Sequence, residues 1–192
     1  IQNLVNIEPD DTVKAFICTQ DLKDEDYVNN NYIIMVTKNG QTKKTSLEQY
    51  SRPRSNGINA ITIKEGDELL EAKLTDGNSQ IMIAVKSGKA IRFEESKTRP
   101  MGRNASGVRG IRLKDDKDEV IGMICVEDEN ANVMVVSENG YGKRSEIEDY
   151  RVTNRGGKGV KTIQLTPKTG DLVSINRVTD DDDLMVTTKN GV

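Results

Sequence analysis

The sequence repeats one pattern with a period of about 50 residues: an apolar stretch, a turn that ends in glycine, a basic stretch and an arginine-bearing connection. Glycines mark this period twice, once at the turns and once after the connections. They are Gly40, Gly88, Gly140 and Gly191 at the turns, and Gly57, Gly107 and Gly159 after the connections. A repeat of this length that contains strands is typical of propeller-like arrays, in which each repeat forms one small sheet.

The third copy shows how a repeat is built. Apolar runs at 120–126 and 133–137 flank an acidic segment, and the turn Asn139-Gly140 leads into a polar run at 141–145. Short β-branched runs bounded by Gly, Asn and Asp indicate strands, and Asn-Gly favours a type I′ turn in which both central residues have positive φ. One more strand is expected in each repeat, over 57–63, 107–113 and 159–165.

These elements give about four strands per repeat, which is the content of a propeller blade. We therefore predict a single all-β, propeller-like domain over residues 1–192. A β-sandwich with coincidental spacing is the alternative. The chain starts at Ile1 and stops within a repeat, so we expect it to be a piece of a longer protein. The predicted repeats are roughly 1–56, 57–106, 107–158 and 159–192.

Composition excludes several classes of site. The chain has no histidine and only two cysteines, so Cys/His metal sites and histidine-based general bases are excluded. Cys18 and Cys125 occupy matching positions in distant repeats, and we predict two reduced core thiols without a disulfide. The acidic run 180–183 is interpreted as a solvated turn rather than a metal site. We expect no catalytic residue and no membrane partner, since no apolar run or signal peptide suggests one.

Basic residues keep the phase of the repeat although the net charge is −3. The fourth residue after the turn glycine is Lys44, Arg92 or Arg144, while acidic residues gather in the turn at the other end of the preceding strand. Stacked blades should therefore carry a basic track, whose side chains could meet successive phosphates of a bent duplex. Each of these residues could instead be an ordinary solvated cation.

The sharpest local motif is Arg-Gly-Gly-Lys-Gly at 155–159. Glycines let the backbone approach a phosphate closely while Arg and Lys supply charge, as in phosphate-binding nests. The spacing does not fit a Walker A loop, so a nucleotide site is not predicted. A flexible loop is the alternative interpretation of this segment.

Three motifs together resemble the family of DNA gyrase A C-terminal domains. They are Arg99-Pro-Met-Gly-Arg103, Gly107-Val-Arg-Gly-Ile111 and Glu138-Asn-Gly-Tyr-Gly-Lys-Arg144. The resemblance implies a six-bladed β-pinwheel with strands exchanged between blades, of which about four blades are present here as an open crescent. It also implies a non-catalytic domain that wraps double-stranded DNA on a basic outer edge.

The same resemblance implies a parent enzyme that is an ATP-dependent type II topoisomerase of the bacterial cytoplasm. In that enzyme two gyrase A chains join two gyrase B chains as an A2B2 complex, ATP and Mg are used outside this domain, and wrapping leads to negative supercoils. The family's box Gln-Arg-Arg-Gly-Gly-Lys-Gly is expected upstream of Ile1. Residues 155–159 match its last five positions, whereas Thr153 and Asn154 replace the first two.

This resemblance implies that the basic residues that keep the phase of the repeat are the DNA track. The residues expected to contact DNA are Lys43, Lys44, Arg52, Arg54, Lys89, Arg92, Arg99, Arg103, Arg109, Arg112, Lys143, Arg144, Arg151, Arg155, Lys158 and Lys161. The equivalent C-terminal domain of topoisomerase IV and a propeller scaffold for protein partners are the alternatives.

Overall fold

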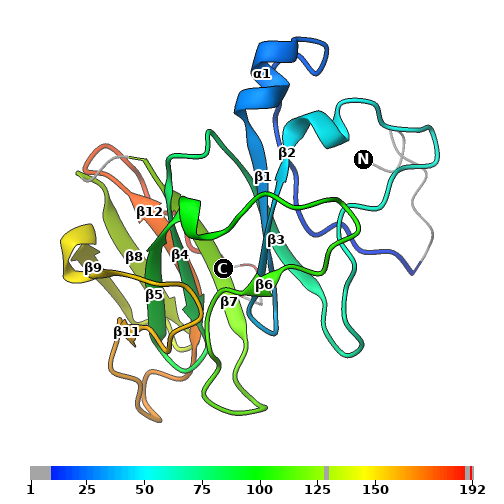
Figure 1. The fold of residues 1–192 in the computed structure, drawn as a ribbon. Coiled ribbons are helices and arrows are strands. Elements are labelled where there is room, and N and C mark those ends of the chain that lie inside the picture. The colour runs from blue at the N-terminus through cyan, green and yellow to red at the C-terminus, as the bar shows by residue number, and fades with distance from the viewer. Residues whose placement is uncertain (1–9, 128–129, 189–190, 192) are drawn as a thin grey trace.

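The computed structural model describes residues 10–127, 130–188 and 191. Nearly all regular structure is β, arranged as three sheets that lie side by side (Figure 1). We call these sheets blades I, II and III in chain order. The one α-helix among the described residues, α1 (Glu25–Asn30), begins after Asp24, whose carboxylate accepts a hydrogen bond from the Tyr27 amide at 3.1 Å. No helix in this part of the chain is long and apolar enough to be a membrane span.

Each blade is built on an antiparallel hairpin followed by a short 3₁₀ turn. Blade I has the order β3-β1-β2-β6 and blade III the order β12-β8-β9. In blade II the order is β10-β5-β4-β7, with β11 also paired to β5. Blade I comprises β1 (Tyr32–Thr37), β2 (Gln41–Ser46), η1 (Leu47–Tyr50), β3 (Leu69–Thr75) and β6 (Val108–Arg109).

The remaining elements belong to the other two blades. Blade II comprises β4 (Gln80–Val85), β5 (Lys89–Glu94), η2 (Glu95–Lys97), β7 (Val120–Val126), β10 (Val152–Thr153) and β11 (Val160–Lys161). Blade III comprises β8 (Asn132–Ser137), β9 (Gly142–Glu146), η3 (Ile147–Asp149) and β12 (Leu172–Val178).

The hairpins sit at the predicted turn glycines, but the predicted turn type is wrong. Val36 pairs with Thr42, and the Gly40 amide donates to the Thr37 carbonyl at 3.0 Å, which closes a tight turn. Gly40 has φ +82°, and among the described residues positive φ occurs only at glycine. A type I turn closed by a left-handed glycine explains this geometry, whereas type I′ would need positive φ at Asn39 as well. Asn190, in the fourth predicted turn, lies outside the described residues.

The segments after the second and third hairpins run along the outer edge of the preceding blade. We call residues 51–68, 98–119 and 150–171 the first, second and third connections. The second connection carries β6, which pairs with β2 of blade I, and the third carries β10 and β11, which pair with β5 of blade II. The predicted strands of this edge are therefore only two residues long in two repeats, and 57–63 contains none. Much of the hydrogen bonding there joins one connection to the next instead.

The apolar core lies between the blades. The inner strand β7 of blade II packs against β3 of blade I and β12 of blade III. One core cluster combines β1 and β4 side chains such as Ile34 and Ile83, and another combines β4 and β8 side chains such as Met82 and Val135. Among the described residues no strand pairing joins blade I to blade III, so the blades form an open arc.

Two segments that fit the repeat pattern contain no assigned strand. They are 13–19 and 184–188. Both cysteines are free, but Cys18 is exposed rather than in the core, because it lies in the first of these segments. Cys125 lies in β7, and its burial raises the pKa of the thiol to about 12.

Candidate nucleic-acid interface

The basic residues selected from the sequence fall into three groups by exposure. Most are exposed: Arg52, Arg54, Arg99, Arg109, Arg112, Lys143, Arg144, Arg151, Lys158 and Lys161. A second group is half-buried: Lys89, Arg103 and Arg155. The third group is buried: Lys43, Lys44 and Arg92.

Lys43 is fully buried beneath two connections. Its ammonium donates hydrogen bonds to the carbonyl oxygen of Ala60, at 2.6 Å, and to that of Arg103. Burial, reinforced by the nearby charge of Arg103, lowers the pKa of Lys43 to about 8. The side chain therefore ties strand β2 to the first and second connections and does not reach solvent.

Lys44 and Arg92 occupy the same position of the repeat, and both link one blade to the next. Lys44 Nζ lies 3.4 Å from the carboxylate of Glu95, the first residue of η2 in blade II. Arg92 donates to the carbonyl oxygen of Ile147, the first residue of η3 in blade III, at 2.8 Å. The repeat at this position thus builds the joint between blades. Neither side chain offers its charge to a phosphate at the surface.

The third member of this series, Arg144, is exposed and pairs with Asp180 at 2.5 Å. Because Lys43, Lys44 and Arg92 are buried, we do not retain them as expected DNA contacts, whereas Arg144 remains accessible.

Glu95 is a partner that sequence reasoning missed. It is fully buried, and it also accepts a hydrogen bond from the Thr75 hydroxyl at 2.7 Å. The signal was present in the repeat, because the equivalent residues Leu47 and Ile147 are apolar core residues. An acid that replaces an apolar residue in one copy of a repeat indicates a buried ion pair, since a lone buried carboxylate is costly.

Eight of the exposed basic residues selected from the sequence lie on the three connections, and we call this set the connection surface. Its members are Arg52 and Arg54 on the first connection, Arg99, Arg109 and Arg112 on the second, and Arg151, Lys158 and Lys161 on the third. Among the described residues none of these eight forms an ion pair, so their charges are available to an external anion. Lys161 donates a hydrogen bond to the Gln164 amide oxygen at 2.8 Å, which leaves its charge uncompensated.

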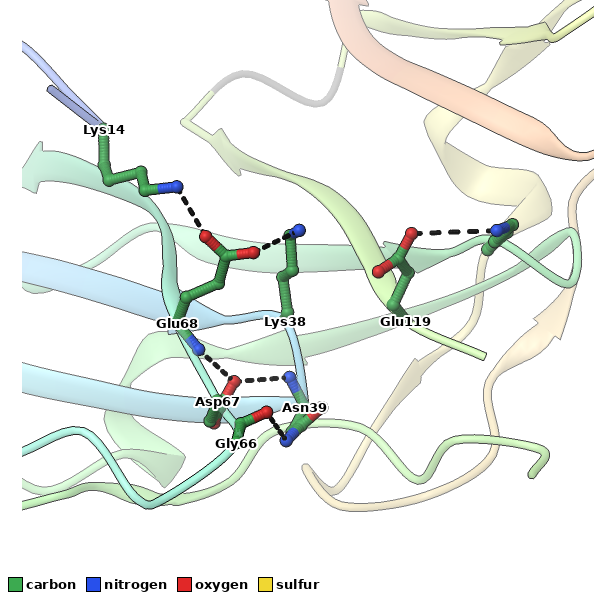
Figure 2. A network of polar contacts seen from close by, with 8 residues as sticks. Lys14, Lys38, Asn39, Gly66, Asp67, Glu68 and Glu119 are labelled. Carbon is green, nitrogen blue, oxygen red and sulfur yellow. Dashed lines mark hydrogen bonds and ion pairs between the residues drawn. The ribbon is translucent and has the colours of Figure 1, made fainter. Parts of the chain in front are cut away.

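The lysines at the hairpin turns, in contrast, are neutralised. Figure 2 shows Glu68 between Lys14, at 2.5 Å, and Lys38. The hydrogen bond from Lys14, followed by that from Lys38, lowers the pKa of Glu68 to about 2. One blade further on, Lys86 lies 3.8 Å from each of two carboxylates, those of Glu119 and Asp171. These pairs separate the hairpin turns electrostatically from the connection surface.

A cleft of about 510 Å³ extends the basic surface at one point. It lies between the hairpin turn of blade II and the second and third connections. Asp118 fixes its wall, because its carboxylate accepts hydrogen bonds from the amides of Ser87 and Lys114, both at 2.9 Å. The cleft is lined by five lysines and three aspartates: Lys86, Lys89, Lys114, Lys117, Lys161, Asp115, Asp118 and Asp171. Lys86 is paired with Glu119 and Asp171, so the other four lysines supply the basic character of the cleft. Of the five lysines, Lys86, Lys114 and Lys117 were not among the residues selected from the sequence.

The described residues contain no group of three or more Cys, His, Asp or Glu side chains placed to hold a metal ion. In the acidic run 180–183, the Asp182 carboxylate accepts hydrogen bonds from the Thr179 amide and hydroxyl at 2.7 and 2.9 Å. That carboxylate therefore closes a local turn.

Comparison with known proteins gives a consistent family. The chain matches the family described as "DNA gyrase C-terminal domain, beta-propeller" over residues 31–76, 80–127 and 131–179. These three matches follow the three blades in order.

Curated relatives include the DNA gyrase A protein of Staphylococcus epidermidis, 44% identical over 193 aligned positions, and that of Staphylococcus aureus, 42% identical. Both alignments cover 100% of this chain but only 21% of the relative. The chain thus spans about one fifth of the length of these relatives.

Solved structures agree on the fold. The C-terminal domain of DNA topoisomerase IV matches with a TM-score of 0.82 and 25% identity, covering 93% of this chain and 54% of that one. A DNA gyrase A C-terminal domain matches with a TM-score of 0.79 and 24% identity, covering 94% and 58%. These similar scores show the shared architecture, while the two staphylococcal relatives, which are more similar in sequence, are gyrase A.

Proposed function

Because this chain belongs to the DNA gyrase C-terminal domain family, we propose that it binds duplex DNA along the connection surface and bends it around the open arc of blades. One observation carries this proposal: eight basic side chains without an ion pair among the described residues lie on three connections that run along one edge. The succession of blades repeats this surface at regular intervals, as a path for a regular polyanion requires.

The physical chemistry favours binding to the phosphate backbone rather than to bases. Lysine and arginine side chains that neutralise phosphates release condensed counterions, so affinity falls steeply with salt. The described connections present short β edges and loops, with no helix or long ribbon that could enter a major groove. Bending the duplex costs a few kcal/mol over two or three helical turns, and several phosphate contacts offset this cost.

The parent protein is proposed from the relatives, since the chain spans only about one fifth of their length. We infer a DNA gyrase A protein that acts with gyrase B as an A2B2 complex in the bacterial cytoplasm. In this proposal, DNA cleavage and the use of ATP and Mg take place outside these residues, and the bent path of DNA sets the direction of supercoiling. The topoisomerase IV alternative is less well supported, because the relatives at 42 to 44% identity are gyrase A.

The proposal is tested by salt-titrated binding to a duplex of about 150 base pairs, one persistence length. The affinity should fall steeply with salt, and replacing Arg99 and Arg151 together by Gln should lower the log–log slope by roughly 0.9 for each lost contact. Arg177→Gln is the matched control, because Arg177 is exposed on the inner strand β12, away from the connections.

An affinity that barely changes between low and physiological salt would overturn DNA binding and favour the scaffold for protein partners. An equal effect of Arg177→Gln would show that the net charge matters and that the connection surface does not.

A further inference from the structure

Two of the half-buried arginines make the same contact in successive repeats. Arg103 Nη1 donates to the carbonyl oxygen of Asn59, and Arg155 Nη1 donates to that of Arg109, both at 3.1 Å. Each arginine is the fifteenth residue after its turn glycine, and each acceptor is the second residue after a connection glycine. Each contact joins a connection to the one before it, and we call it an arginine clip. Since the clip recurs with the same atoms and distance, it is a feature of the repeat.

Backbone hydrogen bonds place the two arginines firmly in this joint. On the third connection, the Gly156 amide donates to the Gly110 carbonyl at 2.6 Å, while the Arg112 amide donates to the Gly157 carbonyl at 2.8 Å. Between the first and second connections, the Thr62 amide donates to the Ala105 carbonyl at 3.3 Å. The arginine therefore lies within a short ladder of hydrogen bonds that holds neighbouring connections in register.

Further hydrogen bonds hold each arginine in place. Arg155 Nε donates to the carbonyl oxygen of Lys97 at 2.9 Å, so its guanidinium bridges two carbonyls. The Arg103 amide donates to the Gln49 side-chain oxygen at 3.1 Å, and its carbonyl accepts from Lys43. The planar guanidinium of Arg155 carries its donors in a fixed fork that fits two carbonyl oxygens at a set angle. The ammonium of a lysine does not reproduce that geometry.

We propose that Arg103 and Arg155 are positioning residues that fix the angle between successive blades and thereby set the curvature of bound DNA. This rests on the proposed function, since it assumes that DNA follows the connection surface. The residues that face the solvent on successive connections, such as Arg99 and Arg151, then keep a spacing that the two clips determine. In this proposal the clips act through these internal hydrogen bonds and contribute no phosphate contact.

The first test separates curvature from affinity. The Arg103→Gln/Arg155→Gln variant should bend a duplex of about 150 base pairs less, measured by energy transfer between labelled DNA ends, and keep its salt slope. Arg99→Gln/Arg151→Gln is the matched control with the opposite result, a lower slope. The opposite result would be a log–log salt slope lower by roughly 0.9 for each replaced arginine, with the bound DNA bent as much as by the unmodified chain. That result would mean that the arginines contact phosphate, and the proposal would be wrong.

A second measurement needs no DNA. Cys18 is exposed and accepts a thiol label, whereas burial raises the pKa of Cys125 and leaves it unreactive. A second label at Glu146→Cys in blade III gives a distance across the arc. We expect this distance distribution to broaden in the Arg→Gln variants, and also in Arg103→Lys/Arg155→Lys, which keeps the charges. An unchanged distribution would overturn the positioning role.

The two measurements also separate this inference from the proposed function. If the unmodified chain shows no salt-dependent DNA binding, the proposed function is wrong. The distance measurement still tests whether the two arginines hold the joint between blades. Circular dichroism identifies variants that fail to fold. If the double variant does not fold, the single variant Arg155→Gln, which leaves the Arg103 clip intact, is measured in both experiments.

Discussion

A buried positive charge is stable only when acceptors surround it, and the three buried basic residues meet this condition in different ways. Arg92 donates to backbone carbonyls of blade III, and Lys44 faces the carboxylate of Glu95. Lys43 donates to two neutral carbonyls, and burial holds its pKa well below the ordinary lysine value. These residues stabilise the joints between blades and between connections.

Lys43 should make the protein more stable as the pH rises above about 8. Its pKa falls from 10.5 to about 8 on folding, so between these values the unfolded chain binds more protons than the folded one. Each pKa unit corresponds to about 1.4 kcal/mol, so the free energy of unfolding should gain on the order of 1 to 3 kcal/mol across this window. Urea denaturation at several pH values measures it. The Lys43→Met variant should lack the rise, and a rise of equal size in that variant would contradict the assignment.

Glu95→Ile should destabilise the chain by about 3 to 5 kcal/mol, because Lys44 would remain buried without its partner. The double variant Lys44→Met/Glu95→Ile should recover much of this loss, since it restores the apolar residue found in blades I and III. Glu94→Gln is the control, as this neighbour is only half-buried. Chemical denaturation measures all three. A single variant as stable as the original chain would show that the pair contributes nothing.

At the scale of elements, a glycine within a connection lets two segments of the chain approach closely. Gly107 has φ +89°, and a Cβ there would lie 2.5 Å from the Thr42 carbonyl oxygen in β2. The equivalent Gly57 has φ +78°, but a Cβ there would meet nothing within 4 Å. The two positions therefore separate backbone strain from a steric clash within one motif.

Gly107→Ala should destabilise the chain more than Gly57→Ala, by about 1 to 3 kcal/mol, because only the former pushes β6 away from β2. Both variants share the cost of a left-handed alanine. Thermal and urea unfolding of the two variants provide the comparison. Equal losses would mean that the second connection moves away from blade I at little cost.

The elements also show how far the sequence could be interpreted. The 50-residue period and the apolar runs predicted the three hairpins at Gly40, Gly88 and Gly140 correctly, because strand pairing within a repeat is local. The edge strands were overestimated, since 107–113 and 159–165 pair with another blade and run partly as loops. The burial of Lys43, Lys44 and Arg92 had no signal in the neighbouring sequence, because the connections and 3₁₀ turns that cover them come from other parts of the chain.

At the scale of the whole molecule, blade II is supported on every side. Its inner strand β7 packs on both neighbours, and its outer strand β5 is covered by β10 and β11. Among the described residues, nothing pairs with the outer edge of β9 in blade III. The number of complete blades could not be predicted from the repeat alone, because 13–19 and 184–188 match the pattern yet pair with no strand in the described part of the chain.

Native-state hydrogen exchange should therefore be slowest in β4 and β5, intermediate in β1 and β2, and fastest in β9. Local opening costs most where strands have neighbours on both sides and where the core is shared. Mass spectrometry of exchanged peptides, resolved by blade, gives this order. Equal protection in β5 and β9 would contradict the view that the third connection stabilises blade II.

The crossing of each connection to the preceding blade has a consequence for synthesis. Blade I has its hairpin and inner strand once Thr75 has left the ribosome, but its outer edge waits for Val108 and Arg109. Blade II likewise waits for Val160 and Lys161. The nascent chain therefore closes each blade one step behind translation, and every newly made connection shields the unpaired edge of the blade before it.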